Sequence, residues 1–184
     1  MSRPTHILRH EHRVIEQALR ALDGMCLKLK TGDSVPPEAL GQLLDFIRNF
    51  GDRFHHNKEE TYLFPALRHN LLQKDSEALR FLMEEHETER KLIAELETAI
   101  EAFRHGDMSA INQFVESANL YRDHMVGLIR EEESILFRLA EEMLDEAVKA
   151  SLIQSLAEQG ARGDDGMAAR YEQLANELEK QWAL

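Results

Sequence analysis

The stretch that decides the fold is FHHNKEETYLFPAL at positions 54–67, where two histidines precede two glutamates by one helical turn. Residues four apart on an α-helix lie on the same face, so His55 shares a face with Glu59. His56 shares the neighbouring face with Glu60 in the same way. At about 100° per residue, His55 and Glu59 project nearer to the mean apolar direction of this segment. We therefore predict that His55 and Glu59 point into a core, whereas His56 and Glu60 face solvent.

Apolar residues recur at helical spacing around this stretch as well. The periodic segments are separated by breaks rich in Gly, Pro and Asp, and they cover residues 5–30, 37–70, 76–104 and 109–139. Short connections between long helices imply antiparallel neighbours. The sequence thus predicts an all-α fold, an up-down-up-down four-helix bundle in residues 1–145. Residues 146–184 are expected to form additional C-terminal helices that pack on the bundle or on a partner.

Three of the four segments present a histidine at one height. His12, His55 and His86 each lie about 18 residues, or roughly 27 Å, from the same end of the expected bundle. A single histidine on an apolar face is more often a hydrogen-bonded core residue than a ligand. Three imidazoles at one level instead indicate a metal site between the helices.

The fourth segment presents Leu128 at that height. His124 lies one turn to one side of Leu128 and beside the apolar seam, whereas Glu132 lies one turn to the other side and on the seam. Glu59 is likewise one turn beyond His55. The two carboxylates therefore share a height next to the imidazole layer and can bridge cations there.

The order and spacing of four motifs resemble the hemerythrin-like, HHE cation-binding proteins. Besides residues 54–67, the motifs are EHRVIEQAL at 11–19, EEHETERKLI at 84–93 and REEESILFRLAEEML at 130–144. The resemblance implies a four-helix bundle with a non-haem di-iron centre. The ligand positions that it implies are His12, His55, Glu59, His86 and Glu132.

The resemblance also identifies a departure, because the family usually has a histidine where this chain has Leu128. Three alternatives follow: His124 substitutes by a local shift, Glu89 supplies the ligand from the turn after His86, or one iron lacks a ligand. We expect weaker or asymmetric occupancy of the second metal position.

Three functions are compatible with such a centre. The first is reversible binding of O2 or NO by a non-enzymatic iron protein that handles iron or oxidative stress. The second is a di-iron enzyme that turns over peroxide, NO or ferrous iron, for which Glu89 or His124 would be the proton donor. The third is a redox-inactive helical interaction module that uses the C-terminal helices as a docking surface.

Composition narrows the class of protein. The 184 residues carry a net charge of -12, which disfavours binding to nucleic acid. No apolar run is long enough for a membrane span, and the N-terminus lacks an apolar signal core. A single cysteine, Cys26, fits a reducing compartment. We therefore expect a cytoplasmic protein, and a homodimer through the C-terminal helices is compatible with the sequence.

Overall fold

The first helix of the computed structural model, α1 (His6–Thr31), follows the apolar stripe predicted for residues 5–30. Leu8, Ile15 and Leu22 on that stripe are buried. The helix ends at Gly32, whose φ of +83° allows its N–H to donate to the Leu29 carbonyl at 3.3 Å. The structure describes residues 3–68, 73–162 and 166–184.

The second segment contains wide helical turns. It consists of α2 (Pro37–Phe46), the π-helical stretches η1 (Ile47–His56) and η2 (Glu59–Leu63), and α3 (Phe64–Arg68). In a π-helix each N–H bonds to the carbonyl five residues back, and such turns are frequent at functional sites. The expected end of this segment near residue 70 lies outside the described residues.

The third and fourth segments form two further long helical stretches. The third is α4 (Gln73–Arg104), and the fourth consists of α5 (Ala110–Glu131), the π-helical turn η3 (Glu132–Leu136) and α6 (Phe137–Met143). The turn between them contains Gly106 with a φ of +89°, which is left-handed backbone that favours glycine.

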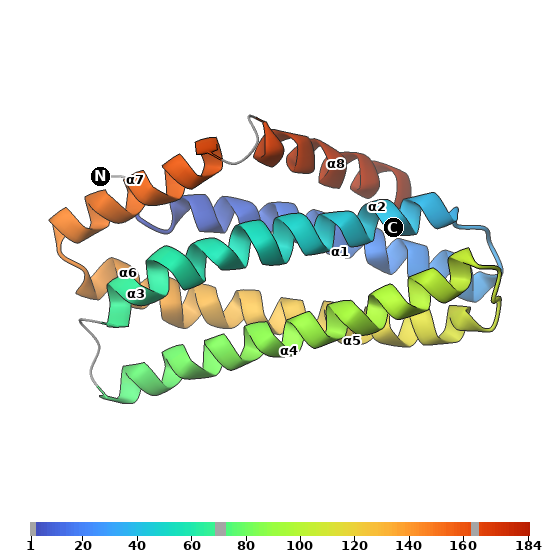
Figure 1. Cartoon of the computed structure of the whole chain (residues 1–184), viewed down its shortest axis with the longest axis horizontal. Coiled ribbons are helices and arrows are strands. Elements are labelled where there is room, and N and C mark those ends of the chain that lie inside the picture. The colour runs from blue at the N-terminus through green and yellow to red at the C-terminus, as the bar shows by residue number, and fades with distance from the viewer. Residues whose placement is uncertain (1–2, 69–72, 163–165) are drawn as a thin grey trace.

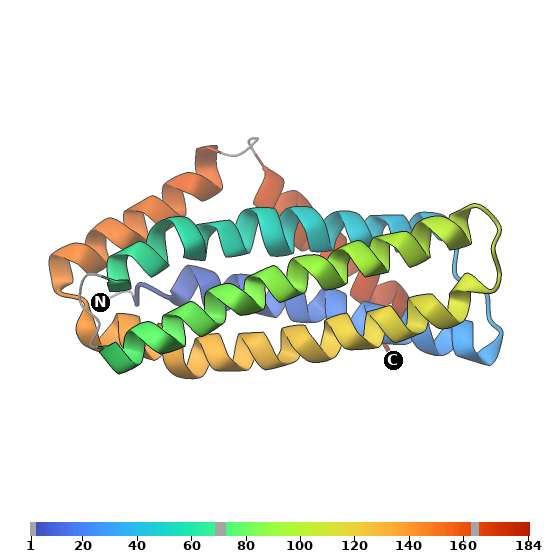
Figure 2. The same ribbon diagram turned by 60° about the horizontal axis from the view of Figure 1, so that its bottom comes forward.

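These four segments lie lengthwise side by side (Figures 1 and 2). Helix α5 contacts both α1 and α4, and α2 also contacts α4. Every regular element in the described part of the chain is helical, so the prediction of an all-α fold is confirmed. None of these helices is long and apolar enough to cross a membrane.

The C-terminal helices are α7 (Glu146–Arg162) and α8 (Met167–Trp182). Helix α8 packs along α1 and α2, and α7 contacts α1 and η2 (Figure 1). The closest approach occurs at Gly24, where an added Cβ would lie 1.6 Å from the Trp182 carbonyl oxygen. Leu178 and Trp182 are buried, so these apolar side chains pack within the same chain.

Candidate metal centre

Four buried side chains from three helical segments meet in the middle of the molecule. The first group comprises His12 on α1, His55 on η1, Glu59 on η2 and Glu132 on η3, with ligand atoms all within 4.8 Å of one another. All four side chains are buried. His12 Nε2 lies 3.2 Å from Glu132 Oε2, and His55 Nε2 lies 3.9 Å from Glu59 Oε1. This arrangement offers two imidazoles and two carboxylates to one cation.

A second group of four shares both carboxylates with the first. It adds His56 from η1 and His86 from α4 to Glu59 and Glu132, again with ligand atoms within 4.8 Å. His86 Nε2 lies 3.1 Å from Glu132 Oε1 and 3.5 Å from Glu59 Oε2. The rings of His56 and His86 stack with centroids 4.1 Å apart. Two adjacent groups joined by two carboxylates are the donor set of a two-metal site.

The donor atoms of these groups lack the partners that buried polar atoms normally have. Most buried polar atoms in proteins form hydrogen bonds, and each exception calls for an explanation. Here the unpartnered buried atoms include Nε2 of His12 and His55, both ring nitrogens of His56, both oxygens of Glu59, and Oε2 of Glu132. Imidazole nitrogens and carboxylate oxygens are good ligands for transition-metal cations. The residues therefore fit a bound metal.

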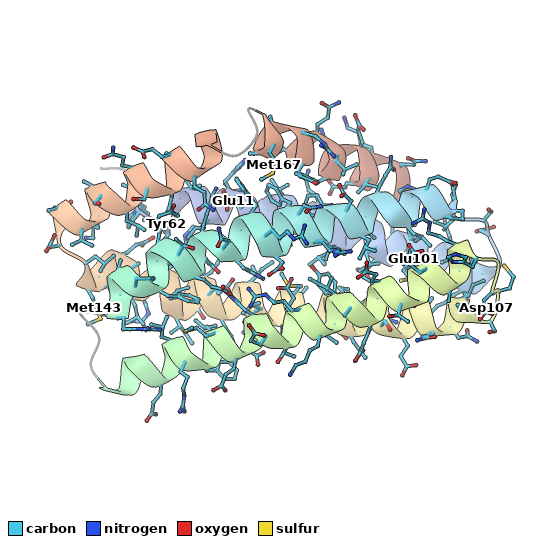
Figure 3. All side chains as sticks on the ribbon, in the orientation of Figure 1. Glu11, Tyr62, Glu101, Asp107, Met143 and Met167 are labelled. Atoms are coloured by element: carbon cyan, nitrogen blue, oxygen red, sulfur yellow. The ribbon has the colours of Figure 1, made fainter. Side chains whose placement is uncertain are left out.

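Carboxylates outside the groups orient three of the four imidazoles. Nδ1 of His55 lies 2.9 Å from Glu11 Oε2, a contact between α1 and η1 (Figure 3). Nδ1 of His12 lies 3.1 Å from a Glu133 oxygen, and Nδ1 of His86 lies 2.8 Å from Glu60 Oε1. A proton on Nδ1 leaves the lone pair of Nε2 available to a metal, and such partners fix the ring orientation.

A buried lysine supports one of these carboxylates. Lys58 Nζ donates to the second oxygen of Glu11 and lies 3.7 Å from the ring centroid of Phe54. Burial alone would raise the pKa of Glu11, but His55 and Lys58 bring that pKa below its usual value. Glu11 therefore stays ionised beside His55.

Comparison with known protein families identifies the chain. The profile of the hemerythrin HHE cation binding domain matches residues 3–140, which contain both groups. The chain belongs to the hemerythrin HHE family. Searches of curated proteins and of solved structures found no match. Cation binding by the His/Glu groups is thus the property that this hemerythrin domain shares with its family.

The two shared carboxylates of the hemerythrin domain titrate in opposite directions. Burial raises the pKa of Glu59 well above its usual value, and the charge of Glu132 raises it further. Burial also opposes ionisation of Glu132, but hydrogen bonds from His12 and His86 outweigh it and bring that pKa well below its usual value. Without a cation, the pair holds a proton on Glu59 and a negative charge on Glu132.

The histidines differ in the same way. Burial lowers the pKa of His55 to about 4, so this ring is neutral near pH 7. Burial opposes the charge on His86 too, but its hydrogen bonds to Glu132 and Glu60 raise its pKa to about 9. A metal ligand must be deprotonated, so a cation bound by His86 releases a proton.

Five of the side chains predicted as ligands lie in the two groups: His12, His55, Glu59, His86 and Glu132. The sixth, His124, lies in neither group within the described residues. Its Nε2 is 3.1 Å from the main-chain carbonyl of Glu85 on α4. Leu128 is buried. His124 therefore does not occupy the position that the family fills with a histidine.

The prediction that His56 faces solvent is wrong. Its side chain is fully buried and belongs to the second group. Glu60 lies at the boundary, with 31% of its side chain exposed, and contacts His86 rather than solvent alone. The signal in the sequence was the adjacent pair of histidines, but a projection at α-helical angles turned the second one outward. Glu11 and Lys58 were also missed, because charged residues are seldom expected in a core.

Proposed function

We propose that this protein is a non-haem di-iron protein whose hemerythrin domain, an up-down-up-down four-helix bundle, binds O2 or NO and thereby handles iron or oxidative stress. The observation that carries the proposal is the convergence of unpartnered buried nitrogen and oxygen atoms in two groups that share Glu59 and Glu132. The side-by-side arrangement of the four helical segments supports the bundle topology (Figure 2).

Iron is the cation that best matches both the donors and the proposed ligand. Imidazole with carboxylate suits iron, and soft sulfur ligands are absent from both groups. Iron bound here supplies a redox-active ion that can accept a diatomic ligand at a coordination position left open by the protein. The two carboxylates also offset the positive charge that two cations would bring into a buried site.

The surroundings of the groups exclude water. The ring of Phe137 stacks on His12 with centroids 5.1 Å apart, and the ring of Phe64 lies 5.5 Å from His86. Both phenylalanines are buried. Leu128 brings an apolar side chain to a position that carries a ligand in the family. An apolar pocket of this kind favours a small neutral ligand such as O2 or NO.

Elemental analysis of protein purified anaerobically from iron medium tests the metal. We expect two iron ions per chain, one for each group. His12→Ala removes a donor that belongs only to the first group, so occupancy should fall. His10→Ala is the matched control, because His10 lies on the same helix with 48% of its side chain exposed and pairs with Glu172. Protein with no bound iron, or with zinc in its place, would contradict the proposal.

Turnover at the same centre is a second candidate, favoured by one contact. Glu89 Oε2 lies 2.7 Å from His56 Nδ1, so a buried carboxyl adjoins the second group as a proton donor for an enzyme would. Stopped-flow mixing of the ferrous protein with O2 or with NO separates the candidates. A stable coloured adduct supports binding. Rapid conversion to the diferric protein that Glu89→Gln slows supports turnover.

A further inference from the structure

A third set of metal-ligating side chains adjoins the second group. It comprises Asp52 and His56, four residues apart on η1, and Glu89 on α4, with ligand atoms within 4.8 Å of one another. We call it the outer group. His56 belongs to both the outer group and the second group, so the two are contiguous.

The buried members of the outer group have unpartnered atoms that face one another. Neither ring nitrogen of His56 forms a hydrogen bond, and Glu89 Oε2 has no hydrogen-bond partner either. The two residues are fully buried, and His56 Nδ1 lies 2.7 Å from that oxygen. The other oxygen of Glu89 accepts only a long hydrogen bond of 3.4 Å from the Tyr121 hydroxyl. Buried donors left in this way are the condition that a bound cation would satisfy.

The electrostatic surroundings favour a cation in spite of a nearby arginine. Arg90 donates to Asp52 at 2.8 Å, but it also contacts Glu60 and Glu87, so its single charge is divided among three carboxylates. Glu89 adds a fourth. An ionised carboxylate has two oxygens that accept several contacts, so Asp52 keeps an oxygen for a metal while it accepts from Arg90.

Other charged side chains around Asp52 are engaged elsewhere. A small cleft beside Asp52 is also lined by Arg48, Arg53 and Glu97. Arg48 pairs with Glu97, and Arg53 donates to Asn49. The cleft therefore leaves the negative charge of the outer group largely uncompensated.

We propose that Asp52, His56 and Glu89 form an outer site for a divalent transition-metal cation, from which the ion passes into the second group. The inference rests on the proposed metal centre and adds a loading site to it. The members of the second group are fully buried, whereas 22% of the Asp52 side chain is exposed. A neutral imidazole has one lone pair for a metal, so His56 ligates in only one group at a time. The outer site is therefore occupied in transit.

The rate at which Co²⁺ enters the metal-free full chain tests the transit role. Co²⁺ absorption reports ligation by the buried groups in a stopped-flow experiment. Asp52→Asn should slow loading about tenfold, because it removes the charge that draws the cation in, and leave the final stoichiometry unchanged. Glu97→Gln is the matched control, since it removes a carboxylate from the same cleft but outside the outer group. Equal rates for Asp52→Asn and the native chain, or equal slowing by both variants, would overturn the proposal.

A second measurement traps the ion in the outer site. His86→Ala removes a ligand that only the second group uses, so His56 is free to ligate with Asp52 and Glu89. We expect this variant to bind one Co²⁺ in the first group and one in the outer site, and the added Asp52→Asn change to remove the latter. Unchanged stoichiometry in the double variant would refute the outer site. A native chain that binds no Co²⁺ at all would refute the proposed function itself, so the two failures are distinct.

Discussion

Replacing Glu59 with glutamine should make the metal-free protein more stable and abolish its metal centre. Both oxygens of Glu59 are buried without hydrogen-bond partners, and its side chain belongs to both four-residue groups. The glutamine amide has the same shape and can donate to Glu132. It carries no charge, so the two buried carboxyls no longer compete. A cation loses a ligand in each group, and we expect iron occupancy to fall at both.

The size and pH dependence of the stability gain follow from the structure. A buried polar group without a partner costs about 1–3 kcal/mol. In a chain of this length, 1 kcal/mol shifts Tm by about 2–4 °C, so we expect a rise of about 2–12 °C. The folded-state pKa of Glu59 is raised above its usual 4.5, so the folded protein holds a proton that the unfolded chain releases. Native stability therefore falls as pH rises above 4.5, and the advantage of the variant grows from pH 5 to pH 8.

Thermal unfolding of the chelator-treated proteins, followed by circular dichroism, measures this effect. Glu60→Gln is a control of opposite sign on the neighbouring residue. Burial opposes ionisation of Glu60, but His86 and Arg90 bring its pKa to about 2, so its ionised form stabilises the fold at pH 7 and the variant should melt lower. A lower Tm for Glu59→Gln at pH 7, or an unchanged iron content, would refute the reasoning.

Three further predictions use the same assays. His56→Ala should remove one of two iron ions, whereas His124→Ala should remove none, and the reverse result would restore His124 as a ligand. Leu128→His should tighten binding of the second ion in a metal titration and lower the Tm of the metal-free protein, because it buries an imidazole without a partner; no change in either would contradict it. Gly24→Ala should cost about 1–3 kcal/mol or more in denaturant unfolding, since its Cβ would overlap the Trp182 carbonyl, and native-like unfolding would show that α8 packs elsewhere.

The sequence predicted the helical segments and five residues of the site because one physical rule governs both. Side chains that repeat every three or four residues face the core, and His12, His86 and Glu132 continue the apolar repeat of their own segments. Counting 1.5 Å per residue from the loops then placed them near the same height. The family profile confirms the hemerythrin resemblance, and it covers most of the chain.

The misplacement of His56 has a specific cause in the backbone. The projection assumed α-helical angles, but His55 and His56 end the π-helical stretch η1, and Glu59 begins η2. A wider turn advances less than 100° per residue, so two consecutive histidines come closer to one face and both can point inward. Nothing in the letters of a single sequence distinguishes a π turn from an α turn.

The wide turns of η1 (Ile47–His56) also affect how the protein tolerates changes in chain length. Loss of one residue, such as the exposed Arg53, would let this stretch rewind as an α-helix. Everything after the deletion would then rotate by about 100° relative to what precedes it. Phe50 and His55 could no longer both face the interior. A single-residue insertion or deletion here would thus be more damaging than many substitutions, and homologues that differ by one residue in this stretch should present a different set of side chains inward.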